Sequence, residues 1–504
     1  MLRAVFAFQA QTAFGLATVW ARRILKTEVT QKKENAAIIF LFSLFIYAIK
    51  KDNVFMKDIT LLCKVVDNYG DIGFVYRLAR SISRKRKDFS LRLIVSNLST
   101  FKKMADEIDE KKSCQEFIFT DSLTGQKYSW QIFDWNASQV CKKEFSEKRP
   151  QILLECFQCG RPEWLDEILF EKENKTFTQI INLEYLTLED WGEEFHLLPG
   201  GTRSPFIKKM NFIPGLTKKT GGLLLDDFFT YAIKNPDAAL KKLSSVLPSQ
   251  EINFLHDKNY FCLTYFSYPK NYKSTVLALK NFSSLLEKNN PSKSLVLFLA
   301  QGLSQNGFLE ECKKENVSFK IINLPYLKQE EWDCLLTLCD FNFIRGEDSF
   351  ARAILSGHPF VWHAYIQAEE FQLVKVDALL KNMQPFFSKE IFSLLKKYFL
   401  LYNRNFEFLP GKEAQKILLE NKIDGGDTSL NAPLSSNEGG ASLKQLQSQN
   451  EEANLTLQKL LENLLSSYEE IKVSFKNFAD YVISSGDLAD NLLSFVDSVW
   501  DKFF

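Results

Sequence analysis

The stretch NFIRGEDSFARAILSGHPFVWHAYIQ, residues 342–367, decides the fold. The apolar run 341–344 predicts a strand, which leads directly into the polar turn RGEDS at 345–349. A helix is predicted next, and GHP at 357–359 ends it before a second strand at 360–363. A strand, a polar turn and a helix form half of an α/β ligand site, because ligands bind where strands end and helix N-termini offer free N–H groups.

The side chains of this turn suit an anionic ligand. Arg345 has the planar guanidinium that binds phosphate as a fork. Asp348 and Ser349 fit the N-cap or first turn of the helix, and they fit a ribose or phosphate equally well. A strand, turn and helix with a capping side chain is also common without any ligand. The density of polar residues favours a site, because Glu347 has no capping role to explain it.

Composition describes a large chain of balanced charge. Its 504 residues predict two to three domains, and a net charge of +1 gives no indication of nucleic acid or a membrane surface as partner. The nine cysteines are scattered and odd in number, which indicates reduced thiols and a cytoplasmic location. Cys156 and Cys159 form one CxxC without a second pair or a nearby histidine, so no metal site is predicted.

Residues 1–55 differ from the rest of the chain. The uncharged apolar run 36–49 is shorter than the roughly 20 residues that a spanning helix needs, and it lies too far in for a signal peptide. A membrane anchor at 36–49 is one interpretation. The preferred hypothesis is that the functional chain starts at Met56 and that 1–55 is an extension outside the fold.

Two Rossmann-like domains are predicted after this extension. The first, over 56–250, has predicted strands at 59–66, 91–96, 152–154, 180–183 and 212–213, with a helix at 74–84. Its first turn, DNYGDIG, lacks the GxGxxG fingerprint, which disfavours a nicotinamide or flavin enzyme. The pattern restarts near residue 250, with strands at 260–266, 294–299 and 319–324 ahead of the opening stretch.

The predicted fold class is therefore α/β, in the arrangement of GT-B glycosyltransferases, whose two Rossmann-like domains face each other across a cleft; this step is a fold-level analogy. The second domain is predicted over 251–400. Helices are predicted over 401–504, with a flexible insertion at 424–452 that is rich in Gly, Ser, Asn and Gln.

Five motifs, taken together, resemble one family in order and spacing. They are VVDNYGDIG (65–73), LEYLTLEDW (183–191), PGLTKKTGGLL (214–224), RGEDSFARA (345–353) and GHPFVWHAYIQ (357–367). The chain is similar, over about 58–395 and again at 484–496, to the EarP family of protein-arginine rhamnosyltransferases that modify translation elongation factor P.

The resemblance implies a GT-B enzyme that uses dTDP-β-L-rhamnose and no metal. It implies inverting transfer to one arginine of elongation factor P, which activates that factor to rescue polyproline-stalled ribosomes. A guanidinium is protonated and a poor nucleophile, so a carboxylate must orient it and take a proton. By resemblance Asp71 is the general base, Asp67 holds the acceptor or its partner carboxylate, and Glu347 completes the acidic site. Asp67 is also suited to cap the helix.

The donor is expected to contact residues of the second half. By resemblance and position these are Phe266, Tyr268, Tyr326, Gln329, Trp332, Arg345, Asp348, Ser349, Tyr365 and Gln367. The aromatics would stack on the base, Gln329 would read the thymine edge, and Arg345 with the helix N-terminus would neutralise the pyrophosphate. The four aromatics from Phe266 to Trp332 also suit an ordinary core. Ile366 replaces the proline that the family usually has before Gln367, and His363 is assigned no role.

Two other functions fit the same sequence. One is a GT-B enzyme with a different acceptor, such as a lipid-linked or surface glycan, which an anchor at 36–49 would favour. The other is a non-catalytic module that binds a nucleotide sugar or a protein, which would not depend on Asp71.

Overall fold

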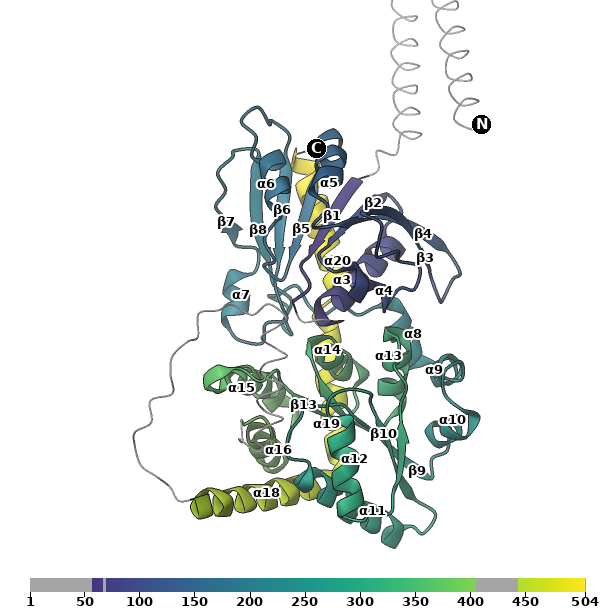
Figure 1. Cartoon of the computed structure of the whole chain (residues 1–504). Helices are drawn as coiled ribbons and strands as arrows, with labels where there is room; N and C mark the ends of the chain where they lie inside the picture. Colours follow the sequence, from purple (N-terminus) through teal and green to yellow (C-terminus); the bar gives the residue numbers. More distant parts are fainter. Residues whose placement is uncertain (1–56, 67–68, 405–442, 504) are drawn as a thin grey trace, which may run out of the picture. The chain divides into compact units, whose positions relative to one another are not determined.

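The computed structural model describes residues 57–66, 69–404 and 443–503 (Figure 1). The extension predicted at 1–55, the base partner Asp67 and most of the insertion predicted at 424–452 lie outside these residues. The last part of that insertion is the start of a helix, α18 (Leu443–Ser466). The helix begins where glycine disappears from the sequence and Leu, Lys, Gln and Glu, which favour helices, take over.

The first sheet contains eight strands in the order β3-β4-β2-β1-β5-β6-β8-β7. They are β1 (Lys57–Cys63), β2 (Phe89–Val95), β3 (Cys114–Thr120), β4 (Lys127–Asp134), β5 (Ile152–Cys156), β6 (Thr178–Leu183), β7 (Pro199–Gly200) and β8 (Ile207–Phe212). All pair in parallel except β3 with β4 and β7 with β8. The six parallel strands have the 3-2-1-4-5-6 order of a Rossmann domain.

The second sheet has five strands, all parallel, in the order β11-β10-β9-β12-β13. They are β9 (Tyr260–Tyr265), β10 (Ser294–Leu299), β11 (Lys320–Asn323), β12 (Phe341–Arg345) and β13 (Phe360–His363). Their continuous apolar runs are typical of parallel strands covered on both faces, which is why the sequence revealed them. The predicted α/β fold of the GT-B type, with two Rossmann-like domains, is confirmed.

Helices cover both sheets. They are α3 (Tyr69–Lys85), α4 (Leu98–Lys102), α5 (Ser138–Glu147), α6 (Glu163–Leu169), α7 (Trp191–Phe195), α8 (Asp227–Lys234), α9 (Pro236–Leu243), α10 (Ser249–His256), α11 (Lys273–Asn289), α12 (Gln305–Lys314), α13 (Gln329–Leu338), α14 (Glu347–Ser356), α15 (Gln372–Met383), α16 (Lys389–Tyr402), α18, α19 (Tyr468–Ser484) and α20 (Leu488–Phe503), with short 3-10 turns η1 (Ala368–Glu370) and η2 (Gln384–Phe386). No helix within the described part of the chain has the length and apolar character needed to cross a membrane.

Two groups of helices pack away from their neighbours in sequence. The side chains of α8 and α9 enter a core with β9, β10 and α13, so they belong to the second half, although the sequence placed 56–250 in the first domain. Conversely, α20 returns to the first sheet and lies along α3 (Figure 1). Both differences have one cause: burial depends on the apolar face of a helix, and chain order does not determine which sheet that face covers.

The return of α20 rests on an apolar stripe and on ion pairs at its edge. Leu492 and Val496 are fully buried in the core of the first half. Asp487, just before the helix, forms a 2.8 Å salt bridge with Lys85 at the end of α3. Asp497, inside the helix, forms one of 2.9 Å with Lys57 in β1. The C-terminal helix is therefore a structural part of the first half.

Truncating this stripe is expected to destabilise the whole protein. Leu492→Ala removes a fully buried side chain and leaves a cavity, which costs about 2–5 kcal/mol of unfolding free energy. Ser494→Ala, on the exposed face of the same helix, is the matched control and is expected to change it by less than about 0.5 kcal/mol. Urea unfolding followed by circular dichroism measures both values. Equal stability of the two variants would show that α20 does not belong to the core.

Candidate active site

The loops at the carboxyl ends of the two sheets meet. The Gln329 amide, at the start of α13 after β11, donates a 2.8 Å hydrogen bond to the carbonyl of Gly73 in the first turns of α3. The rings of Tyr69 and Tyr326 lie 6.1 Å apart across the same boundary. A site at this boundary therefore receives side chains from both halves, as ligand sites of open α/β sheets do.

Asp71 lies on the first-half side of this boundary. Helix α3 begins at Tyr69, so Asp71 occupies its first turn instead of the open turn that the sequence predicted. Its carboxylate is 1% exposed, accepts from the backbone N–H of Val66 at 2.8 Å and accepts from the hydroxyl of Tyr185 at 3.0 Å. Each oxygen is thus oriented by a hydrogen-bond donor.

A strained loop after β5 supports Tyr185. Phe157 and Gln158 both adopt left-handed backbone conformations, with φ of 61° and 51°, which non-glycine residues rarely occupy. The Phe157 ring stacks on the Tyr185 ring with centroids 4.3 Å apart, and the Gln158 amide donates to the carboxylate of Glu184. The sequence predicted no role for Phe157 or Gln158, and Glu184 and Tyr185 appeared in it only within the motif LEYLTLEDW. The signal it offered was two polar loops, each directly after a buried strand.

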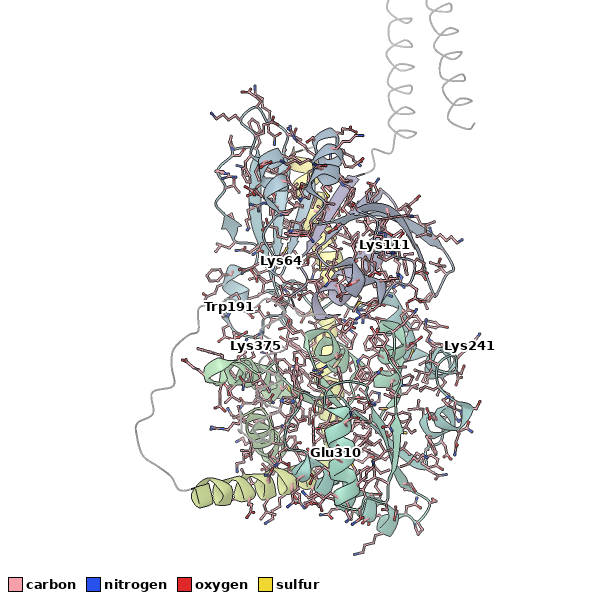
Figure 2. The ribbon with its side chains drawn as sticks, in the orientation of Figure 1. Lys64, Lys111, Trp191, Lys241, Glu310 and Lys375 are labelled. Carbon is pink, nitrogen blue, oxygen red and sulfur yellow. The ribbon has the colours of Figure 1, made fainter. Side chains whose placement is uncertain are left out.

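Arg345 is the centre of the second-half side. Its guanidinium carbon lies 4.5 Å from the ring centroid of Phe266 and 4.7 Å from that of Tyr268. Such cation–π contacts fix the direction of the guanidinium without removing its charge. Gly346 follows with φ of 73°, and Glu347 then begins α14, with its carboxylate 3.1 Å from the ammonium of Lys375 (labelled in Figure 2).

The remaining predicted donor residues fall into two groups. Trp332 contacts Phe266 edge-on at 5.4 Å and donates its indole N–H to the Ser349 hydroxyl at 3.1 Å. Tyr365 lies 5.7 Å from the Tyr268 ring and is half exposed. These residues extend from the two rings, Phe266 and Tyr268, that contact Arg345.

The second group faces other partners. Tyr326 contacts Tyr69, Gln329 binds Gly73 and accepts from Arg80 at 3.1 Å, and Asp348 pairs with Arg77 of α3. The backbone of Gln367 donates to Gln372 at 3.0 Å. The roles predicted for these side chains toward a donor stay predictions. None of the four aromatics is fully buried, which distinguishes them from ordinary core residues.

His363 is buried next to Tyr268 and helps to hold that residue in place. Its Nδ1 accepts the backbone N–H of Tyr268 at 3.2 Å, and its ring is 4% exposed. Burial, together with the positive charges of Lys270 and Arg345, holds the pKa of His363 well below its usual value of 6.5. The imidazole is therefore neutral and acts as a structural acceptor.

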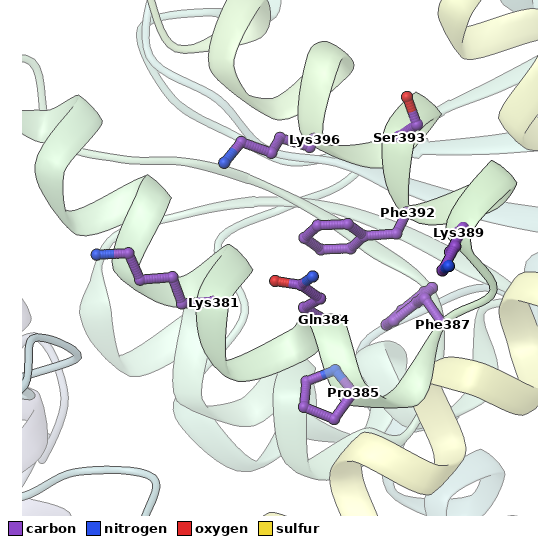
Figure 3. Close-up of a pocket in the computed structure, with 8 residues that line it drawn as sticks. All are labelled: Lys381, Gln384, Pro385, Phe387, Lys389, Phe392, Ser393 and Lys396. Atoms are coloured by element: carbon purple, nitrogen blue, oxygen red, sulfur yellow. The ribbon is translucent and has the colours of Figure 1, made fainter.

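Within the described part of the chain, these residues coincide neither with a group of metal ligands nor with the hollow at α15, η2 and α16. Among the residues that the structure describes, no group of three or more His, Cys, Asp or Glu side chains is arranged to hold a metal ion. A hollow of about 620 Å³ lies at α15, η2 and α16, where Phe387, Phe392 and Lys396 are among its lining (Figure 3). None of the predicted site residues lines it, so it is a separate feature.

Two Rossmann-like domains, with a buried carboxylate on one half and an arginine against two aromatic rings on the other, have the architecture of the GT-B type. The comparisons with known proteins identify the group. Residues 59–497 match the family model described as "Elongation-Factor P (EF-P) rhamnosyltransferase EarP", and the chain belongs to this family.

Similar proteins carry corresponding names. A protein-arginine rhamnosyltransferase of Pseudomonas putida is 27% identical over 349 residues, which are 69% of this chain and 87% of that protein. One of Shewanella oneidensis is 30% identical over 346 residues, 64% of this chain and 81% of that protein. A solved structure described as the basis for EarP-mediated arginine glycosylation of translation elongation factor EF-P aligns over 88% of this chain and 99% of that one, with a TM-score of 0.44 and 17% identity.

The low pKa of His363 predicts a pH-dependent stability. Its folded pKa lies below its unfolded value, so below pH 6.5 the unfolded chain binds the proton and the folded state does not. The free energy of unfolding therefore falls as pH decreases, by up to about 1.4 kcal/mol per pH unit from this residue. His363→Gln removes this titration and is expected to show a shallower loss between pH 6.5 and 5.5 in urea unfolding. At pH 8 the histidine is neutral in both states, so the difference between the two proteins there gives the cost of the substitution in packing. If the free energy of unfolding falls equally steeply with pH in both proteins, the prediction is wrong.

Proposed function

We propose that this chain transfers L-rhamnose from dTDP-β-L-rhamnose to an arginine of translation elongation factor P, with inversion, without a metal and in the cytoplasm. One observation carries the proposal: in a member of the EarP family, Asp71 is buried on the first half and accepts from Val66 and Tyr185, while Arg345 on the second half lies against Phe266 and Tyr268. The relatives are named for the same transfer to protein arginine.

In the proposed reaction, the first half of the chain binds the acceptor arginine and takes its proton. An arginine side chain is protonated at neutral pH, and its delocalised lone pairs make it a poor nucleophile. Val66 and Tyr185 each donate a hydrogen bond to Asp71, so its carboxylate has a fixed orientation when a guanidinium enters. As a guanidinium nitrogen forms its bond to the anomeric carbon, the proton on that nitrogen passes to Asp71. Asp67, by resemblance, holds the acceptor beside it.

In the same reaction, the second half of the chain binds the donor and stabilises the negative charge of the leaving group. When the bond from the anomeric carbon to the phosphate oxygen breaks, its electron pair leaves with dTDP. Arg345 and the N–H groups at the start of α14 would neutralise this charge, which is the role a metal has in other transferases. Attack from the face opposite the leaving group inverts the anomeric configuration. Glu347 would steady the guanidinium or the positive charge that develops on the sugar.

Intact-mass spectrometry tests donor, acceptor and reaction together. Elongation factor P from the same organism, incubated with this protein and dTDP-β-L-rhamnose, is expected to gain the mass of one deoxyhexose. Fragmentation is expected to place it on an arginine, and addition of EDTA is expected to leave the yield unchanged. An unmodified factor in the presence of bound nucleotide would move the assignment to another acceptor, such as a glycan. Absence of any nucleotide binding would favour a protein-binding module.

Loss of the base is expected to abolish transfer without unfolding the protein. Asp71→Ala removes the proton acceptor and is predicted to reduce kcat by at least about 10²-fold to 10⁴-fold, the usual contribution of a general base. Asp237→Ala, which removes an exposed carboxylate from the first turn of α9, is the matched control and is expected to keep the wild-type rate. Circular dichroism confirms folding of both. Normal transfer by Asp71→Ala would refute the assignment of the base.

A further inference from the structure

A buried arginine links α3 to the donor half. The Arg77 guanidinium is 1% exposed and binds Asp333 of α13 as a fork, with contacts of 2.5 and 3.2 Å. The same group contacts Asp348 of α14 at 3.0 Å and Asp226, which caps α8, at 3.4 Å. Three elements of the second half therefore converge on one side chain of the first half.

Two further arginines extend this contact along α3. Arg80 and Arg84 follow Arg77 at spacings of three and four residues, which places all three on one face of the helix. Arg80 contacts Glu330 at 3.4 Å, and Arg84 contacts Asp121 and, at 3.4 Å, Asp226. All three side chains are nearly inaccessible to solvent, so the pairs are not ordinary surface salt bridges.

Arg77 is the arginine of this group that contacts the first turn of α14, whereas Arg80 contacts Gln329 of α13 and Arg84 contacts Asp121 and Asp226. Asp348 lies between Glu347 and Ser349 in the first turn of α14, and its side chain keeps 23% exposure while Arg77 holds one of its oxygens. Arg77 also shares α3 with Asp71, six positions earlier, which corresponds to about 9 Å along a rigid helix. One guanidinium therefore connects the helix of the proposed base with the turn that carries the donor residues.

We propose that Arg77 is a positioning residue for the transfer: it orients Asp348 toward the donor and sets the placement of α14 relative to α3. The inference rests on the proposed function, because it assigns Asp348 to the donor site. Arg77 itself need not touch the substrate. It acts through Asp348 and through the fixed contact between the two helices.

The charges around Arg77 support this role. Burial pushes the pKa of Asp348 upward, but Arg77 and Arg352 outweigh it and hold that pKa below its usual value, so Asp348 stays charged. Burial raises the pKa of Asp333 to about 6 despite Arg77. Without the fork both carboxylates would lose their main partner. A lysine keeps the charge but offers a point contact, so it cannot satisfy Asp333 and Asp348 in the same geometry.

The test compares the conservative substitution Arg77→Lys with Arg84→Lys, its matched control. Both change one buried arginine of the same helix face, but Arg84 does not contact Asp348. Arg77→Lys is expected to raise the KM for dTDP-rhamnose and the Kd for dTDP at least about tenfold, whereas Arg84→Lys is expected to change either by less than about twofold. Isothermal titration with dTDP and initial rates give these values, and the thermal midpoint of each variant reports its stability.

A double-mutant cycle separates positioning from general destabilisation. If Arg77 acts through Asp348, then adding Asp348→Asn to Arg77→Lys changes the Kd for dTDP far less than the product of the single effects, whereas Asp348→Asn combined with Arg84→Lys gives the product. Equal effects of the two lysine variants, or multiplicative effects for Arg77 and Asp348, would overturn the inference.

A wild-type protein that binds dTDP but leaves elongation factor P unmodified would refute the proposed acceptor alone, since the binding comparison still decides the role of Arg77. A wild-type protein that does not bind dTDP would overturn both.

Discussion

The structure depends on burying the charged face of α3. One face of this helix, with Ile72, Val75 and Leu78, completes the core of the first sheet, and the opposite face presents arginines to the second half. A buried charge without a partner is strongly destabilising, so these arginines are compatible with folding only if Asp226, Asp333 and their neighbours stand opposite. Packing and pairing on the two faces of one helix thereby link the two Rossmann-like halves, and the candidate site lies at the N-terminal end of that helix.

Buried charge pairs of this kind fix the arrangement of two elements more than they add to the free energy of unfolding. Apolar residues of similar size would often hold two elements together equally well, but an apolar contact tolerates sliding. A guanidinium fork on Asp333, with a second contact to Asp348, permits one arrangement of α3 against α13 and α14. For a reaction that needs a base from one half and charge stabilisation from the other, such a fixed arrangement is useful because small displacements of reacting groups cost rate.

The sequence predicted the elements better than their contacts. Parallel strands such as β9 and β12 are continuous apolar runs, and their ends led directly to Arg345 and Glu347. The β3–β4 hairpin was not predicted, because alternate buried and exposed residues make its strands weaker signals than an apolar run. The burial of Arg77, Arg80 and Arg84 was not predicted, for another reason. Arginines on one helix face usually point to solvent, and Arg77 and Asp333 are 256 positions apart, so no periodicity connects them.

The division of labour between the halves follows from where each kind of group is found. On the first half, Asp71 is surrounded by hydrogen-bond donors and a strained loop that holds Tyr185, an arrangement that orients a carboxylate. On the second half, Arg345 lies against the rings of Phe266 and Tyr268, and such cation–π contacts hold a guanidinium in position without removing its charge. The proposed base and the arginine proposed to stabilise charge therefore come from different halves, and the buried Arg77 contacts join those halves.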